Sequence, residues 1–369
     1  MIEIKNRLNN QPENYFITNV INTVNTTRIN HDDIYYYNVS VSNMIYPSKN
    51  ISWRPNAVIL VPSDKWQFGA CASSVVHFPF NAPIFFTERN FMPPIVLNEI
   101  LRLDPTGEGV PAKVLIAGPV SLGVENYLKS FGLTTYKITD TDNVYNASAE
   151  IANFRLNIVP TTSQEVTQDI IVISGQYYGE GIPATFYAAH MGTPIILVQK
   201  DFIPQSIVNF ISNNPSKNYY LLGSELTIGQ NVEQQIRNMI NGNVNRITGN
   251  SPFEVSVNFS KYESPTDNFG WKHNTANGWA FSYGELNNWN NIISSVLLAH
   301  LGKHTPLLVI DKNYLPAVVR EYVINVNPRN MMPEPPYMHA YILGSFSDIS
   351  YETQVEIEKV TNIMAKMEH

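Results

Sequence analysis

The chain has 369 residues, of which 44% are hydrophobic and 15% are charged, and its formal net charge is −7. This length suits two or three domains, and an acidic balance without a Lys/Arg cluster argues against a nucleic-acid-binding surface. The single cysteine, Cys71, excludes an intramolecular disulfide framework, and no stretch is apolar over the length that spans a bilayer.

The N-terminal segment has no apolar core of the length that a secretory signal peptide needs. We therefore consider three locations for the protein. It acts at the cell wall or surface, after removal of a leader or after export by another route. Otherwise it stays in the cytoplasm, or it is part of a spore or a parasporal inclusion.

Short apolar runs alternate with helix-like stretches after a polar lead-in over residues 1–27. A polar turn at residues 28–35 precedes a short predicted helix over 38–46. The first full unit then opens with a continuous apolar run, which is typical of a strand buried on both faces. Its predicted strands are 57–61, 83–87, 113–118 and 134–138, and its predicted helices are 69–78, 93–103 and 121–131.

Two further units repeat this order. The second has predicted strands at 169–174, 194–198, 218–223 and 244–247, and helices at 181–191, 204–212 and 229–240. The third has predicted strands at 279–283, 306–310 and 339–344, and helices at 291–301, 316–323 and 350–364. Alternation with short connections predicts parallel strands and right-handed crossovers. The expected fold class is therefore α/β, with three tandem, three-layer, Rossmann-like modules built on parallel sheets.

One polar signature occurs three times, at residues 28–35, 137–145 and 246–253, and its basic residues are 109 positions apart in both steps. A domain-sized period indicates tandem copies of a small domain. Because the third unit ends without a signature, we expect the first copy to complete it and to bring the two chain ends close together. The predicted division is 1–55 (lead-in and first signature, packed with the third module), 56–160, 161–263 and 264–369.

Three motifs recur in the same order in each unit. The stretch 246–249 reads Arg-Ile-Thr-Gly, and an aromatic residue, Phe253, follows it; 83–87 reads Pro-Ile-Phe-Phe-Thr and 194–197 reads Pro-Ile-Ile-Leu. The third strand of each unit ends in Gly, at Gly118, Gly223 and Gly344. These motifs resemble the signature, the Pro-Ile-Leu-Leu-Thr strand and the Ile-Gly-Gly strand end of the cell wall binding repeat type 2 family, which occurs as three tandem copies in surface proteins of Gram-positive bacteria.

The sequence departs from this family at one position of the signature. The arginine of the family's Asp-Arg-Tyr is missing in every copy, and its place is taken by Ile34, Val144 and Pro252. The resemblance still covers nearly the whole chain from about residue 27. It implies three modules around a pseudo-threefold axis and non-covalent anchoring to an anionic polymer of the cell wall.

An acidic chain needs a local basic patch to bind an anionic polymer, because charges act over only ~8 Å at physiological salt. The candidate ligand-binding residues are the basic residues nearest the repeated turns: Arg28, Lys113, Lys137, Lys217 and Arg246. The alternative is that the three signature residues among them are structural and bind backbone carbonyls or a neighbouring module.

Three histidines occupy equivalent places, His77, His190 and His300, each at the end of the first predicted helix of its unit. A threefold axis would bring these imidazoles together, as a pH-sensitive or metal-binding cluster. The alternative is that each histidine simply occupies a helix C-terminus, where a partly positive side chain is favourable because the helix end is partly negative. Separations above ~10 Å would exclude the cluster, because a zinc bond is only about 2 Å long.

No catalytic motif emerges from the sequence. The stretch 175–181 is Gly-rich between a strand and a helix, where a nucleotide phosphate sits in a doubly wound fold, but the equivalent stretches lack its glycine spacing. We expect a non-catalytic wall-binding surface protein without a cofactor or a bound metal. The alternative is a self-assembling, spore-associated or parasporal particle protein that binds copies of itself, because Asn and Tyr make adaptable contacts suited to a lattice.

Overall fold

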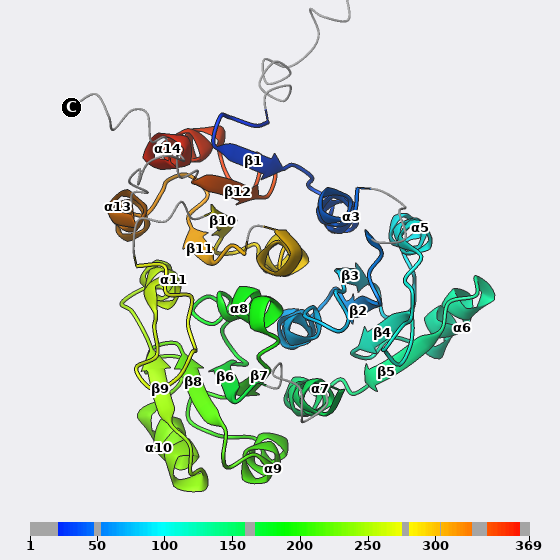
Figure 1. The fold of residues 1–369 in the computed structure, drawn as a ribbon, viewed down its shortest axis with the longest axis horizontal. Helices are drawn as coiled ribbons and strands as arrows, with labels where there is room; N and C mark the ends of the chain where they lie inside the picture. Colours follow the sequence, from blue (N-terminus) through cyan, green and yellow to red (C-terminus); the bar gives the residue numbers. More distant parts are fainter. Residues whose placement is uncertain are drawn as a thin grey trace, which may run out of the picture.

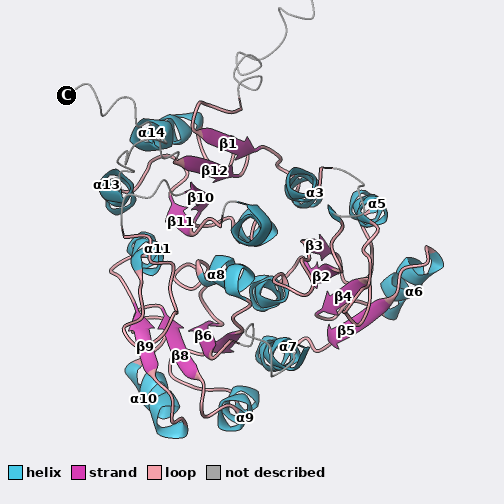
Figure 2. Cartoon of the chain, in the orientation of Figure 1, coloured by secondary structure: helices cyan, strands magenta, loops and turns pink. Residues whose placement is uncertain are grey.

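The computed structural model describes residues 21–47, 53–158, 167–274, 280–302, 304–326 and 338–361. Three four-stranded parallel sheets surround a group of central helices (Figure 1). Figure 2 shows that helices flank the strands of each sheet. The predicted fold class, α/β with three modules and parallel sheets, is confirmed.

All three sheets have the same strand order. The first contains β2 (Val58–Pro62), β3 (Ile84–Thr87), β4 (Val114–Ala117) and β5 (Thr135–Thr139), in the order β3-β2-β4-β5. The second contains β6 (Asp169–Ser174), β7 (Ile195–Val198), β8 (Asn218–Leu222) and β9 (Val244–Ile247), in the order β7-β6-β8-β9. The third contains β10 (Ala280–Glu285), β11 (Leu307–Ile310), β12 (His339–Leu343) and β1 (Thr26–Ile29), in the order β11-β10-β12-β1.

The fourth strand of the third sheet comes from the start of the chain. Thr26 of β1 lies opposite Ala340 of β12 in a parallel pair, and the backbone N–H of Asn25 donates to the carboxylate of Glu358 at 2.9 Å. The sequence predicted a turn over residues 28–35. Its first two residues instead end β1, because the edge of β12 supplies a strand partner from more than 300 residues away, and the bend follows at residues 32–33. The module boundaries at 55/56, 160/161 and 263/264 stay predictions. The second of them, and the two chain ends, lie outside the described residues.

The first helix of each module faces the centre of the molecule. These helices are α4 (Trp66–Ala72) with η2 (Ser73–Val75), α8 (Ala184–Met191), and α12 (Trp289–Ser294) with the π turn η3 (Leu298–Gly302). Helix α8 contacts both η2 and η3 there (Figure 1). The continuous helices predicted over 69–78 and 291–301 are wrong. The hydroxyls of Ser73 and Ser295 donate to carbonyls four residues back, a contact that bends a helix.

The outer helices match the prediction more closely. They are α5 (Pro94–Leu103), α9 (Gln205–Asn213) and α13 (Ala317–Val326) after the second strands, and α6 (Leu122–Ser130), α10 (Gln230–Met239) and α14 (Tyr351–Thr361) after the third strands. No helix in the described ranges is both long enough and apolar enough to cross a membrane.

A helix follows each signature and packs on the next module. These helices are α3 (Ile34–Ile45), α7 (Val144–Ile158) and α11 (Pro252–Lys261). Helix α3 contacts β3 and α5, α7 contacts β7 and α9, and α11 contacts β11 and α13. The sequence pattern predicted only α3, and placed its start four residues late, because the side chain of Asp33 caps it by accepting the N–H groups of Tyr35 and Tyr36.

The fifth residue of each of these helices binds the backbone of the strand that it covers. The amide of Asn38 accepts the N–H of Phe86 at 2.8 Å and donates to the carbonyl of Ile84 at 3.2 Å. The hydroxyl of Ser148 accepts the N–H of Leu197 at 2.9 Å, and that of Ser256 accepts the N–H of Val309 at 3.0 Å. Each sheet therefore has the edge beside its second strand closed by a helix of the preceding module, which protects that edge from pairing with other chains.

Candidate binding surface

The signature arginine of the third module is a buried clamp. Arg28 is 3% exposed, and its guanidinium donates to the carbonyls of Gly344 and Ser345 at 2.8 and 2.7 Å and to the side chain of Gln354 at 2.9 Å. It also lies 4.4 Å from the centre of the Phe346 ring. Burial lowers the pKa of Arg28 to about 10, so it stays charged at neutral pH while holding the turn after β12.

The other two signature residues make equivalent contacts. Arg246 donates to the carbonyl of Gly223 at 2.9 Å and pairs with Glu233 at 2.7 Å. Lys137 pairs with Glu125 at 2.9 Å. These partners, like Gln354, are each the fourth residue of the helix that follows the third strand. All three residues therefore connect the fourth strand of their sheet to that helix, as expected if they have a structural role. Ligand binding by these residues stays a prediction.

The two remaining candidates lie at the amino ends of strands. Lys113 directly precedes β4 and pairs with Asp104 at 3.1 Å. Lys217 directly precedes β8 and donates to the carbonyl of Thr167 at 2.6 Å. The five predicted residues are therefore spread over different parts of the modules rather than gathered into one patch, and a role for Lys113 and Lys217 in binding also stays a prediction.

The three predicted histidines do converge near the centre of the molecule. The rings of His77 and His300 have centroids 4.7 Å apart, and Nδ1 of His190 lies 3.2 Å from Nδ1 of His304, which the sequence analysis missed. Among the described residues, no three His, Cys, Asp or Glu side chains are placed to hold a metal ion together.

These imidazoles are held in a neutral state. Burial lowers the pKa of His77 and of His190 to about 4, and that of His300 to about 3. The ring of His190 stacks on Trp271 with centroids 4.8 Å apart, and Nε2 of His300 lies 2.8 Å from the amide oxygen of Asn81. The cluster joins the modules, and a sensing role for it stays a prediction.

A second set of cations repeats in all three modules. The residues Arg89, Lys200 and Lys312 each lie two positions after the end of the second strand, at the carboxyl ends of the strands of their sheet. Their carbonyls accept the N–H groups of Ser121, Gly229 and Ser350 at 2.8, 2.7 and 2.9 Å, and these residues directly precede α6, α10 and α14. The backbone of each cation is thus fixed in the same way in every module.

The surroundings of these three cations differ. The guanidinium of Arg89 pairs with Asp64 at 2.8 Å and with Asp142 at 2.5 Å, and these hydrogen bonds raise the pKa of Arg89. Lys200 and Lys312 are exposed, and neither forms an ion pair with another residue in the described part of the chain. Two of the three modules therefore present an available ammonium group at the edge of the sheet.

The sequence carried a signal for these residues that was not used. Each cation follows the proline that opens the second strand, Pro83, Pro194 or Pro306, by six positions. The signal was missed because the residues next to it differ, reading Glu-Arg, Gln-Lys and Asp-Lys. Only the common backbone bond to the next helix shows that the positions are equivalent.

No protein-family model matches the chain. The amidase enhancer of Bacillus subtilis (strain 168) is 29% identical over 219 residues, which are 58% of this chain and 27% of that protein. Cwp6 from Clostridium difficile has a TM-score of 0.72 at 18% identity and covers 90% of this chain and 47% of its own. Cwp8 from the same organism has a TM-score of 0.72 at 17% identity, with coverages of 92% and 52%.

This chain spans about half the length of the two solved structures and about a quarter of the curated relative. The identity to the solved structures is low, so their similarity concerns the fold. That fold includes the three modules that the repeated motifs predicted. The chain thus resembles the cell wall binding repeat type 2 proteins both in the order of its motifs and in its fold of three α/β modules.

Proposed function

We propose that the chain is a non-catalytic, cell-wall-associated protein that binds an anionic wall polymer at the carboxyl ends of the strands of its second and third modules. The observation that carries this proposal is the exposed lysine at the same position of two modules, Lys200 and Lys312, where Arg89 of the first module is held by two carboxylates. In open parallel sheets, ligands bind outside the carboxyl ends of the strands. The relation to an amidase enhancer and to the cell wall proteins Cwp6 and Cwp8 supports a location at the wall.

Repetition matters because each exposed contact is weak. An ion pair near 4 Å in water contributes only about 1 kcal/mol, and salt screens it further. A polymer with regularly spaced negative charges can contact several modules at once, and each later contact then forms at a high effective concentration. Binding of this kind should be tight to the polymer, weak to its monomer and sensitive to salt.

The test is co-sedimentation with purified Gram-positive cell walls, intact or stripped of their anionic polymers. The wild-type chain should pellet with intact walls and stay in the supernatant with stripped walls. The double variant Lys200→Ala/Lys312→Ala should bind about 25-fold more weakly, since about 1 kcal/mol is lost per contact.

The matched control is Lys129→Ala/Lys359→Ala, which removes the same charge from two exposed helix positions in α6 and α14. It should bind as the wild type does. Equal losses in the two double variants would mean that net charge alone acts, and pelleting with stripped walls would reject the anionic polymer. Particles that grow with concentration in the absence of walls, detected by light scattering, would instead favour self-assembly.

A further inference from the structure

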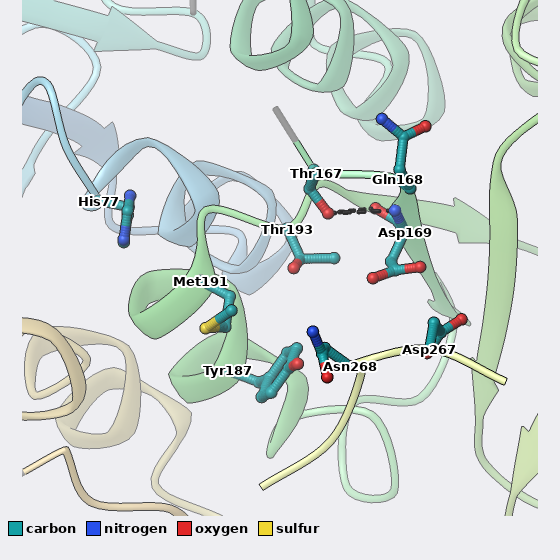
Figure 3. A pocket seen from close by; sticks show the side chains of 9 residues that line it. All are labelled: His77, Thr167, Gln168, Asp169, Tyr187, Met191, Thr193, Asp267 and Asn268. Atoms are coloured by element: carbon teal, nitrogen blue, oxygen red, sulfur yellow. Dashed lines mark hydrogen bonds between the residues drawn. The ribbon is translucent and has the colours of Figure 1, made fainter. Parts of the chain in front are cut away.

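A cavity of about 540 Å³ lies at the opposite end of the second module from Lys200. Its lining comes from the start of β6, from α8 and the turn after it, from the loop that follows α11, and from His77 of the first module (Figure 3). This volume falls in the range of small-molecule sites, about 300–1,000 Å³. The cavity therefore has room for an organic ligand rather than for a bare ion alone.

Two carboxylates, Asp169 and Asp267, line this cavity. The side-chain amide of Asn218 donates to both, at 3.1 Å and 2.9 Å, so one group holds the two acids side by side. Asp267 also accepts the hydroxyl of Tyr220 at 2.6 Å and the N–H of Phe269 at 2.9 Å. Their positions are thus set before any ligand arrives, which lowers the entropic cost of binding.

Both carboxylates are ionised at neutral pH. Burial raises the pKa of Asp169 to about 6, and the nearby charge of Asp267 acts in the same direction. Burial also opposes the ionisation of Asp267, but the hydrogen bonds from Tyr220 and Phe269 outweigh it and lower the pKa of this group. The charge of Lys217 acts on Asp169, and the charge of Lys272 acts on Asp267. The ammonium group of Lys217 already donates to the carbonyl of Thr167 and to the side chain of Gln168, and that of Lys272 pairs with Glu263 at 3.8 Å.

The rest of the lining offers neutral polar groups and one apolar side. Figure 3 shows Thr193 and Asn268 between the carboxylate of Asp169 and the side chains of Tyr187 and Met191 from α8. No Lys or Arg is among the described residues that line the cavity. A ligand with a positive charge, a hydroxyl group and a face of C–H groups matches this lining.

We propose that this cavity binds a hydroxylated amine, the chemistry of an amino sugar. The ammonium group lies between Asp169 and Asp267, a hydroxyl bonds to the exposed amide of Asn268, and the C–H face of the ring packs on the exposed side chain of Met191. An ammonium with two carboxylates makes charge-assisted hydrogen bonds, which are about twice as strong as neutral ones. The site would repel an anionic polymer, so it is independent of the function proposed above.

The experiment is calorimetric titration of the full chain with the β-1,4-linked dimer of glucosamine at about pH 7, where most of the amine is protonated and Asp169 is mostly ionised. The N,N′-diacetylated dimer has the same ring and hydroxyls but no ammonium, and it should bind at least tenfold more weakly. Asp169→Asn should weaken binding of the amine dimer at least tenfold, and Asn268→Ala, at an exposed position that preserves the fold, should weaken it severalfold. Asp201→Asn, an exposed acid at the other edge of the same module, should leave the affinity unchanged.

The pH dependence gives an independent check. Lowering the pH to about 5 should weaken binding of the amine dimer to the wild type, because Asp169, with a pKa of about 6, becomes protonated while the amine stays charged. Binding that is equal for the free and acetylated dimers would overturn the proposal. So would the absence of binding by folded protein at about 10 mM dimer, or tight binding of calcium ions that excludes the dimer.

Discussion

Ser148→Ala tests whether the three modules unfold together. Ser148 is fully buried in α7, and its hydroxyl accepts the N–H of Leu197 at 2.9 Å in the next sheet. Alanine keeps the helix and removes the acceptor, so a buried N–H is left without a partner. Such a loss costs about 1–3 kcal/mol, with about 2 kcal/mol as the central value.

The resulting shift in melting temperature depends on the size of the unfolding unit. The entropy of unfolding is about 2.1 cal/mol/K per residue, so a unit of 369 residues gives about 0.8 kcal/mol/K and a shift of about 2–3 °C for 2 kcal/mol. A single module of about 105 residues gives about 0.2 kcal/mol/K and a shift of about 9 °C. Because helices α3, α7 and α11 each cover a strand of the next module, we expect one transition and the small shift.

Differential scanning calorimetry measures both quantities in one scan. The control is Ser130→Ala, at an exposed position in α6, which should stay within about 0.5 kcal/mol of the wild type. A second transition, or a shift near 9 °C confined to part of the heat absorption, would show that the modules unfold independently. That result would refute the coupling that we infer from the three covering helices.

Two further predictions follow from the repeat. Arg28→Ala should lower the free energy of unfolding by about 3 kcal/mol or more, because buried carbonyls lose their donor. Lys137→Ala, at the equivalent but more exposed position, should lower it by about 1 kcal/mol. Equal losses of the two variants in urea titrations would contradict the role of Arg28 as a buried clamp. Burial lowers the pKa values of His77, His190 and His300 below the ordinary value of about 6.5. As the pH falls, these histidines therefore bind protons in the unfolded chain before they do so in the folded one. The free energy of unfolding should then decrease as the pH is lowered from about 6.5 to about 4. A urea midpoint that stays constant over this range, or a dependence that His300→Gln leaves unchanged, would count against the neutral cluster.

The strands could be predicted because the local sequence indicates that they are buried. Every residue of β2, β3 and β4 is buried, and each of these strands appears as a continuous apolar run between turn residues. A strand buried on both faces needs no alternation of polar and apolar side chains, so the run alone identifies it. The period of the signature then showed that the unit is repeated.

Helix α7 was missed because its sequence carries a weak apolar pattern, and α11 was missed because its apolar residues Val255, Val257 and Phe259 alternate with polar ones. Helix α7 packs against its neighbours mainly through small residues, among them Ala147, Ser148 and Ala152. Small and polar side chains suit a helix wedged between two modules, where backbones lie close and hydroxyls reach a strand. Such a pattern has no clear hydrophobic stripe, so its meaning depends on the neighbouring module.

The sequence by itself determined that this protein consists of three α/β units, because apolar runs, proline positions and a period of 109 residues are properties of the chain. Only the tertiary structure decided which cations face inward and which face solvent. Arg28 is enclosed by the turn after β12, whereas Lys200 and Lys312 extend from the sheet edges. The physical reason is that the role of a charged side chain depends on the groups packed around it, and those groups come from distant parts of the chain.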